Sequence, residues 1–432
     1  MLPQTSEATR LVEKADSLRQ EALRTTLEES IATYQQAQSL AEKNNETLAR
    51  TKALLGRGAA LTWLARAEEA LRVLDEAKSL TEGSSEALRA EILVYHGVAK
   101  RTVGDNAEAV RTFKEAADLA RGVGDKRVEA LALNSIGWAG EQPGLLTAAD
   151  KRAALETAVR IQRGLADAHD LSMSLCGLGL VVSGMQGPKA AIPYYEEALA
   201  IARNGNSSRA MGQALSLLGY AHSSLGDLDK SLAYYEESLP LTRRAGHRIQ
   251  EPYTTQGIAR ILVDRGRMRE ALKYYQEALA VREEINDRRA IGFSLHNVGV
   301  AFGGLGDNAR AAEYYERALV AHREIGDTLE EATTLLGLAS LRLDEGNPRS
   351  ALELSERALA VYRERKDQLR STWALRYKGL SLLVLGRYRE SIQSYSEALE
   401  ICRAISNKTD EAGTARWLGT VYALVGDRQE AL

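Results

Sequence analysis

The sequence predicts an all-α solenoid, a fold in which similar helix pairs stack one on the next along the chain. Three observations predict it: a repeat of fixed length, a helical spacing of apolar residues within each repeat, and turn residues between the helices. The repeat is clearest in six glycines spaced 40 residues apart, at Gly226, Gly266, Gly306, Gly346, Gly386 and Gly426. A fixed period of about 20 to 50 residues is the signature of a stacked repeat architecture.

Each repeat is expected to consist of two amphipathic helices joined by a tight turn. In the clearest copy, Leu295, Val298 and Phe302 recur at helical spacing in the first helix, and the second helix shows the same spacing. Between the helices, Gly306 suits the left-handed conformation that ends a helix, and Asp307 suits the cap of the next one.

A small residue near the end of each second helix gives the register of the repeats. It occurs at Ala37, Ala77, Ala116, Ala158, Ala198, Ser238, Ala278, Ala318, Ala358 and Ala398. We therefore expect a single solenoid over residues 1–432, with ten full repeats and a truncated eleventh. Their approximate bounds are 7–45, 46–84, 85–125, 126–167, 168–207, 208–247, 248–287, 288–327, 328–367, 368–407 and 408–432.

Two repeats depart from the regular spacing. Repeat four contains two additional residues near Glu141–Gly144, where proline and glycine break a helix. Repeat five slips by one residue at Gly184–Pro188. Because the period resumes at once, we interpret both as altered turns within the solenoid, with a domain boundary as the alternative.

Charge and composition exclude several classes of protein. The 56 Lys and Arg residues nearly balance the 59 Asp and Glu residues, which argues against a nucleic-acid or anionic-membrane binder. No apolar run reaches the roughly 18 residues of a membrane span, and the first residues lack signal-peptide features, so we expect a cytoplasmic protein. Cys176 and Cys402 lie in distant repeats and are expected to be two buried thiols rather than a disulfide.

The repeats resemble tetratricopeptide repeats. The family pattern W-x2-L-G-x2-Y followed by A-x3-F appears as Leu295-x2-Val298-Gly299-x2-Phe302 with Ala311-x3-Tyr315. A small residue holds the glycine site in ten units, because two helices cross closely there, at Gly58, Gly97, Gly137, Gly179, Gly219, Ala259, Gly299, Ala339, Gly379 and Gly419. The resemblance implies a right-handed superhelix of stacked helix-turn-helix repeats.

The 40-residue length distinguishes this array from the usual 34-residue repeat. Such longer repeats are similar to those of kinesin light chains, of the spindle adaptor that binds GoLoco proteins, and of bacterial arrays that precede a CHAT (caspase-like) protease domain. The opening segment 18–37 and helices such as Tyr194-Tyr195-Glu196-Glu197-Ala198-Leu199 resemble the bacterial CHAT proteins most.

In this family the first helices line the concave face of the superhelix, which binds partners. Carried over by register, the resemblance implies these concave-face residues: Asn134, Trp138, Gln213, Tyr220, Tyr253, Gln256, Arg260, Phe293, His296, Asn297, Trp373, Arg376 and Arg416. Aromatic and arginine side chains dominate binding energy at interfaces. Related arrays carry an asparagine ladder here, of which this chain keeps only Asn134 and Asn297. The alternative for any one residue is packing or ordinary surface.

Other patterns carry no predicted chemistry. Paired tyrosines such as Tyr194 and Tyr195 could suggest base stacking, but the second of each pair matches the core aromatic of the family, and no basic groove accompanies them. The six histidines lie in different units without metal-ligand spacing, and Cys176 has no nearby histidine. We therefore predict no catalytic residue, no metal and no cofactor.

The predicted function is a protein-interaction scaffold that binds a protein or peptide in its concave groove. We expect it to be the sensor or regulatory arm of a larger bacterial protein such as a CHAT protease, because a truncated last repeat would expose an apolar edge. The alternative is a free-standing adaptor that joins two partners. An enzyme in its own right is the reading we disfavour.

Overall fold

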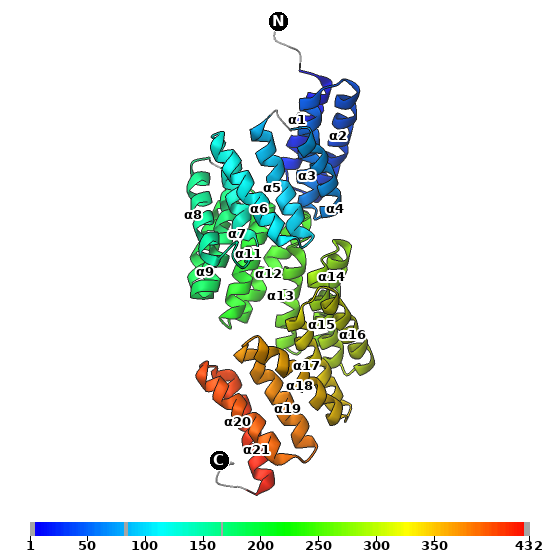
Figure 1. Cartoon of the computed structure of the whole chain (residues 1–432), viewed down its shortest axis with the longest axis vertical. Helices are drawn as coiled ribbons and strands as arrows, with labels where there is room; N and C mark the ends of the chain where they lie inside the picture. The colour runs from blue at the N-terminus through cyan, green and yellow to red at the C-terminus, as the bar shows by residue number, and fades with distance from the viewer. Residues whose placement is uncertain (1–4, 82–84, 166, 427–432) are drawn as a thin grey trace. The chain divides into compact units, whose positions relative to one another are not determined.

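The computed structural model describes residues 5–81, 85–165 and 167–426, and the regular elements within them are 21 α-helices (Figure 1). Their bounds are α1 Glu7–Gln20, α2 Arg24–Lys43, α3 Thr47–Trp63, α4 Ala67–Ser79, α5 Glu86–Thr102, α6 Asn106–Gly122, α7 Lys126–Trp138, α8 Ala148–Arg163, α9 Ala168–Gln186, α10 Pro188–Asn204, α11 Ser208–Ser224, α12 Leu228–Arg244, α13 Glu251–Asp264, α14 Met268–Glu284, α15 Arg288–Gly304, α16 Asn308–Glu324, α17 Thr328–Asp344, α18 Pro348–Glu364, α19 Gln368–Val384, α20 Tyr388–Ala404 and α21 Lys408–Val425. The predicted all-α solenoid of helix pairs is confirmed.

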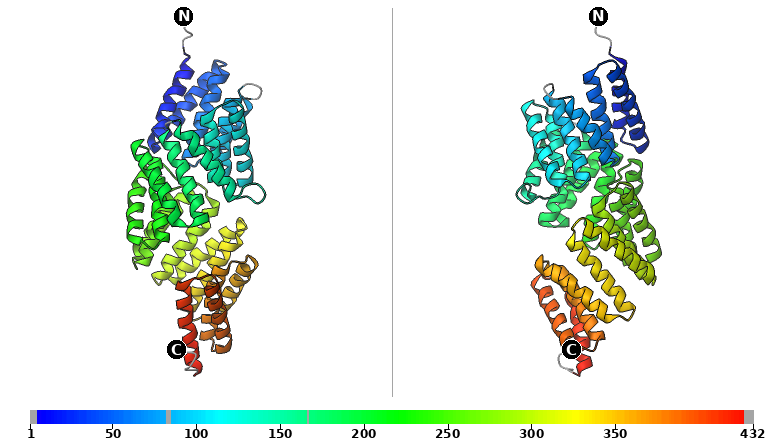
Figure 2. Two further views of the ribbon diagram at one scale, coloured as in Figure 1. Left: turned by 90° about the vertical axis from the view of Figure 1, so that its left-hand side faces the viewer. Right: turned by 45° about the vertical axis from the view of Figure 1, so that its right-hand side comes forward.

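The chain divides into two compact units. Unit 1 comprises Met1–Ile261 and Glu284–Asp287, and unit 2 comprises Leu262–Glu283 and Arg288–Leu432. Helices that follow one another in the chain lie side by side as antiparallel pairs (Figure 2), and first helices of successive pairs also contact each other, as α9 contacts α11 and α17 contacts α19. This is the contact pattern of stacked pairs. The prediction of one continuous array over the whole chain stays a prediction.

The turns between helices use the predicted residues. Gly306 has a φ of +78°, in the left-handed region, and Asp307 caps α16 by accepting a hydrogen bond from the backbone N–H of Arg310 at 3.1 Å. Asn206 and Asn286 take the same left-handed conformation at turns between repeats, with φ of +50° and +54°. Asparagine tolerates this region better than other side chains do, so the turn survives without glycine.

Close helix crossing explains the glycine site. A Cβ atom added at Gly219 would lie 2.9 Å from Tyr235 Cδ1 in the same repeat, and one added at Gly257, in the next repeat, would lie 2.4 Å from Tyr235 Cζ. Tyr235 is therefore clamped between two first helices. The second tyrosine of each pair is buried, which confirms its packing role over a base-stacking one, at Tyr195, Tyr235, Tyr275 and Tyr315.

Both irregular repeats show altered turns. In repeat four, α7 ends at Trp138, and the connection to α8 closes with an isolated bridge between Gln142 and Leu146. Buried Leu146 anchors this connection in the core. In repeat five, α9 continues to Gln186, and Gly187, with a φ of +92°, precedes Pro188 at the start of α10. Neither turn marks the boundary between the units.

Candidate functional site

Three side chains at one repeat position are exposed on consecutive first helices of unit 1. Leu180 on α9, Tyr220 on α11 and Arg260 on α13 lie 40 residues apart, and we call them the exposed row. Arg260 Nη2 donates a hydrogen bond to Ser223 Oγ, which holds the guanidinium beside α11. Tyr253, two turns earlier on α13, is 51% exposed, and Tyr220 is 50% exposed. Two aromatic rings and a guanidinium thus occupy adjacent first helices.

The same face is buried towards the start of α11. Gln213 is only 4% exposed, and Ser216 is buried beneath residues of α13. The Ser216 hydroxyl accepts a hydrogen bond from Gln250 Nε2 at 2.7 Å and lies 3.1 Å from Thr254 Oγ1. Gln256 on α13 is buried as well. The predicted groove residues Gln213 and Gln256 therefore lie in packed surroundings, unlike Tyr220 and Tyr253.

Trp63, at the end of α3, contacts the start of α11. The guanidinium carbon of Arg209 lies 5.3 Å from the centroid of the Trp63 ring, and Arg209 Nη1 donates to the Trp63 carbonyl oxygen at 3.3 Å. The Trp63 and His169 ring centroids are 5.7 Å apart, and His169 Nδ1 lies 2.9 Å from Ser207 Oγ. Residues 146 positions apart in sequence are thus joined within unit 1.

Burial lowers the pKa values of the basic groups at the contact between Trp63 and Arg209. Arg209 is 7% exposed, and burial lowers its pKa to about 9, so it stays charged at neutral pH. Burial, assisted by the charge of Arg209, lowers the pKa of His169 to about 4. Burial also lowers the pKa of His247 well below its usual value. At neutral pH the contact therefore contains one cation, Arg209, between neutral rings.

A second polar cluster joins α1, α2 and α5. Tyr34 donates to Asp16 Oδ1 at 2.6 Å, while Arg19 Nε donates to the Tyr34 hydroxyl oxygen at 3.2 Å and Arg19 Nη1 donates to the Tyr95 hydroxyl oxygen at 3.5 Å. Near this cluster, burial and the repulsion of a neighbouring carboxylate raise the pKa of Asp170 to about 7. These groups are polar links between helices of unit 1.

The predicted residues of repeat four have structural contacts. Asn134 is buried, and Trp138 packs against a core cluster that includes Leu175 and Tyr195. Trp138 Nε1 donates to the Met173 carbonyl oxygen at 3.3 Å on the next first helix. Both side chains therefore help to join repeats four and five.

Unit 2 contains the remaining predicted residues. Phe293 is exposed on α15, whereas His296 is half-buried against the Tyr315 ring at 5.4 Å, and burial lowers the pKa of His296 to about 4. Among the other predicted residues of unit 2, Asn297, Trp373 and Arg376 are half-buried. Arg416 on α21 is exposed.

Two of these residues bind a carboxylate of the same unit. Trp373 Nε1 donates to Asp410 Oδ2 at 3.3 Å, and Arg376 Nη1 donates to Asp410 Oδ1 at 2.8 Å. Asp410 lies in the first turn of α21, so this contact joins α19 to the next first helix. The polar groups of Trp373 and Arg376 are thus already engaged within unit 2.

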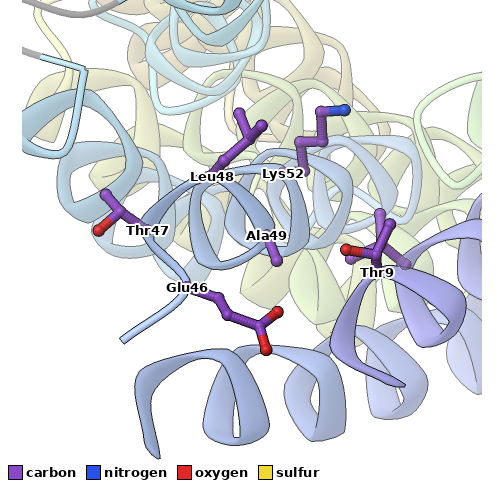
Figure 3. Close-up of a pocket in the computed structure, with 7 residues that line it drawn as sticks. Thr9, Glu46, Thr47, Leu48, Ala49 and Lys52 are labelled. Atoms are coloured by element: carbon purple, nitrogen blue, oxygen red, sulfur yellow. The ribbon is translucent and has the colours of Figure 1, made fainter. Parts of the chain in front are cut away.

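A small cavity lies between α1 and the start of α3 (Figure 3). Its volume is about 290 Å³, and its lining is Thr9, Val12, Glu46, Thr47, Leu48, Ala49 and Lys52. Glu46 accepts a hydrogen bond from Ser6 Oγ at 2.5 Å, and Figure 3 shows Lys52 pointing away from Glu46. The cavity therefore lacks a set of polar groups converging on one ligand position.

The described residues contain no group of three or more His, Cys, Asp or Glu side chains that could hold a metal ion. Cys176 and Cys402 are free and buried, as predicted, and burial raises the pKa of both thiols. A raised pKa disfavours the thiolate and hence nucleophilic reactivity. Across the part of the chain that the structure describes, no helix is both long and apolar enough to span a membrane.

Of the predicted groove residues of unit 1, Tyr220, Tyr253 and Arg260 are exposed on α11 and α13, and their role in binding stays a prediction. Leu180 was missed, although the 40-residue spacing from Tyr220 identifies it. Trp63 and its contact with Arg209 were also missed, and no repeat pattern relates these two residues.

Family models match much of the sequence. One tetratricopeptide repeat model matches residues 210–284, 251–324 and 290–364, and a second matches 336–404. A model of anaphase-promoting complex subunit 5 matches residues 68–141 and 154–225. A comparison with curated proteins finds no significant match.

Solved structures share the fold at low identity. The apo form of the quorum sensor NprR from B. thuringiensis is 14% identical, with a TM-score of 0.56 over 84% of this chain and 99% of that one. A Rap protein complexed with competence and sporulation factor is 14% identical, with a TM-score of 0.54 over 88% and 99%. RapI in its apo form is 16% identical, with a TM-score of 0.51 over 60% and 93%. The repeat pattern, the close helix packing at the glycine site and the family matches together establish that this chain is a tetratricopeptide repeat protein.

Proposed function

We propose that this protein is an interaction scaffold that binds a protein or peptide partner on the first-helix face of unit 1. The exposed row of Leu180, Tyr220 and Arg260, together with Tyr253, carries the proposal. The three residues of the row repeat at one register on adjacent helices, and all four side chains are exposed. Binding, rather than catalysis, is the activity we assign to the chain.

The chemistry of the row suits a partner-binding surface. Tyrosine and arginine are enriched among residues that dominate interface energies, because they bury large areas and still make polar contacts. Arg260 is held against Ser223, so less side-chain freedom is lost when a partner binds. Truncating one such anchor typically costs about 2 kcal/mol or more, which is roughly a 30-fold loss of affinity.

The other predicted residues differ in how accessible they are to a partner. Phe293 and Arg416 are exposed in unit 2 and are accessible to a partner there. Trp373 and Arg376 are engaged by Asp410, so a partner would have to compete with that carboxylate. Asn134, Trp138, Gln213, Gln256, His296 and Asn297 are buried or half-buried, and their contribution would require a local opening.

Structures with a similar fold suggest by analogy that partner binding has a regulatory role. One similar structure is a Rap protein complexed with competence and sporulation factor, and another is described as a quorum sensor. We propose by analogy that partner binding here is regulatory, as in an arm of a larger protein such as a CHAT protease. The alternative, an adaptor, differs in requiring two partners bound at once. Immobilising one partner and testing retention of a second separates the two.

The proposed surface is tested by a double substitution. Tyr253→Ala with Arg260→Ala should abolish capture of specific partners while leaving helical content and the melting temperature unchanged. The matched control is Tyr388→Ala with Arg389→Ala, which removes the same residue types from the second helix α20. Partners captured equally by the wild type, the control and the double variant would refute the assignment.

A further inference from the structure

One turn between repeats is buried where its equivalents are open. A Cβ atom added at Gly246, in the turn between α12 and α13, would lie 3.0 Å from Arg24 Cβ and 3.2 Å from Leu64 Cδ2. At Gly124 and Gly326, which hold equivalent turn positions, nothing lies within 4 Å. The α12–α13 turn therefore has a specific neighbour, namely the α3–α4 turn and the start of α2.

Trp63, the last residue of α3, brings an aromatic side chain to this place and also packs against the core cluster that includes Leu61 and Leu64. Trp63 lies under the guanidinium of Arg209 and beside the ring of His169, and its carbonyl oxygen accepts a hydrogen bond from Arg209. A cation over an indole ring is the strongest arrangement of its class, and it strengthens when desolvated. Arg209 is buried, so its guanidinium is shielded from water. Arg209 therefore contacts both an aromatic ring and the carbonyl group of the same residue.

The covered place belongs to the face proposed to bind partners. Arg209 and Gln213 are one turn apart on α11, and both are buried, whereas Tyr220 on the same helix is exposed. On α9, His169 lies near the start of the helix, as Arg209 does on α11, and Leu180 lies nearer its end. Trp63 thus contacts this face near the start of α9 and α11, while Leu180 and Tyr220 further along these helices are exposed.

We propose that Trp63 is an intramolecular latch, seated in a binding site for an aromatic residue of the partner. The partner segment carries an aromatic side chain and offers its backbone carbonyl to Arg209, so it displaces Trp63 and takes over both contacts. The part of the proposal that concerns the partner rests on the proposed function. The existence of the aromatic site does not, because it can be measured without any partner.

The test uses the full chain and N-acetyl-tryptophanamide, a probe that has both an indole ring and a carbonyl group. Trp63→Ala should bind the probe at least tenfold more tightly than the wild type does, by calorimetry. Adding Arg209→Gln should reverse most of that gain. Trp417→Ala, on α21, is the matched control and should behave as the wild type. N-acetyl-leucinamide should not bind to any variant.

Hydrogen exchange of the wild type keeps the test decisive if Trp63→Ala fails to fold. A saturating amount of the probe should speed amide exchange in the α3–α4 turn at least fivefold, because the latch is displaced, and should leave α19–α21 unchanged. A folded Trp63→Ala variant that does not bind the probe would overturn the proposal. So would a wild type whose α3–α4 turn exchanges at the same rate with and without the probe. Loss of partner capture in the Tyr253 and Arg260 variant bears only on the proposed function.

Discussion

Adding one methyl group at Gly179 should destabilise the protein, although alanine is the better helix former. The Cβ atom would lie 2.5 Å from Tyr195 Cε1 and 3.1 Å from Tyr194 Cβ. Carbon atoms normally approach to about 3.5–4.0 Å, so the Tyr195 ring would have to move by roughly 1 Å. Tyr195 is fully buried, which leaves it little room to do so.

The expected magnitude follows from two opposing terms. Overpacking a tight interior costs about 1–3 kcal/mol, and the enclosed ring places this case near the upper end. Replacing a helical glycine by alanine returns about 1 kcal/mol. The free energy of unfolding should therefore fall by about 2 kcal/mol in Gly179→Ala.

Gly184 provides a control on the same helix. It lies five residues further along α9, and nothing would be within 4 Å of an added Cβ atom. Gly184→Ala should therefore be neutral or stabilise the protein by up to about 1 kcal/mol. The two variants should differ by about 2–3 kcal/mol in urea unfolding followed by circular dichroism. Equal midpoints, or a more stable Gly179→Ala, would refute the close-crossing argument.

Two further predictions concern polar groups of unit 1. Because burial raises the pKa of Asp170 from 3.8 to about 7, the folded state retains a proton that the unfolded state releases, and stability is lost as the pH rises from about 4 to 7. Asp170→Asn should therefore raise the urea midpoint at pH 8 more than at pH 4, and an equal effect at both would contradict this. Ser231 donates to the Gly219 carbonyl oxygen at 2.7 Å, as Ser391 does to that of Gly379, whereas other repeats have alanine, as at Ala311. Ser231→Ala should cost about 1 kcal/mol or less by urea unfolding, and a loss of several kcal/mol would show a larger role for this bond.

The regular part of the fold could be predicted because its causes are local and recur. A glycine in the left-handed conformation, a capping aspartate and a small residue at a helix crossing each act within one repeat or between neighbours. Gly306, Asp307 and Gly219 therefore behave as their sequence positions indicate. The altered turn of repeat four was also visible, because two extra residues interrupt a fixed period.

The candidate site was less predictable from register alone. The spacing placed Gln213 and Tyr220 on one helix face, yet the first is buried and the second exposed. Near the buried end of that face, Trp63, from another part of the chain, contacts Arg209, one turn before Gln213. Register specifies which side of a helix a residue occupies, but not what a distant segment places on top of it.

By itself, the sequence determined that this protein is an array of tetratricopeptide helix pairs, with its turns, crossings and first-helix face in register. Only the tertiary structure decided which part of that face is open. Repeat signals report contacts between neighbouring units, which every unit must make to bury its apolar side. The contact between Trp63 and Arg209 joins segments that are 146 residues apart, and it depends on how the stacked repeats of unit 1 bring those segments together.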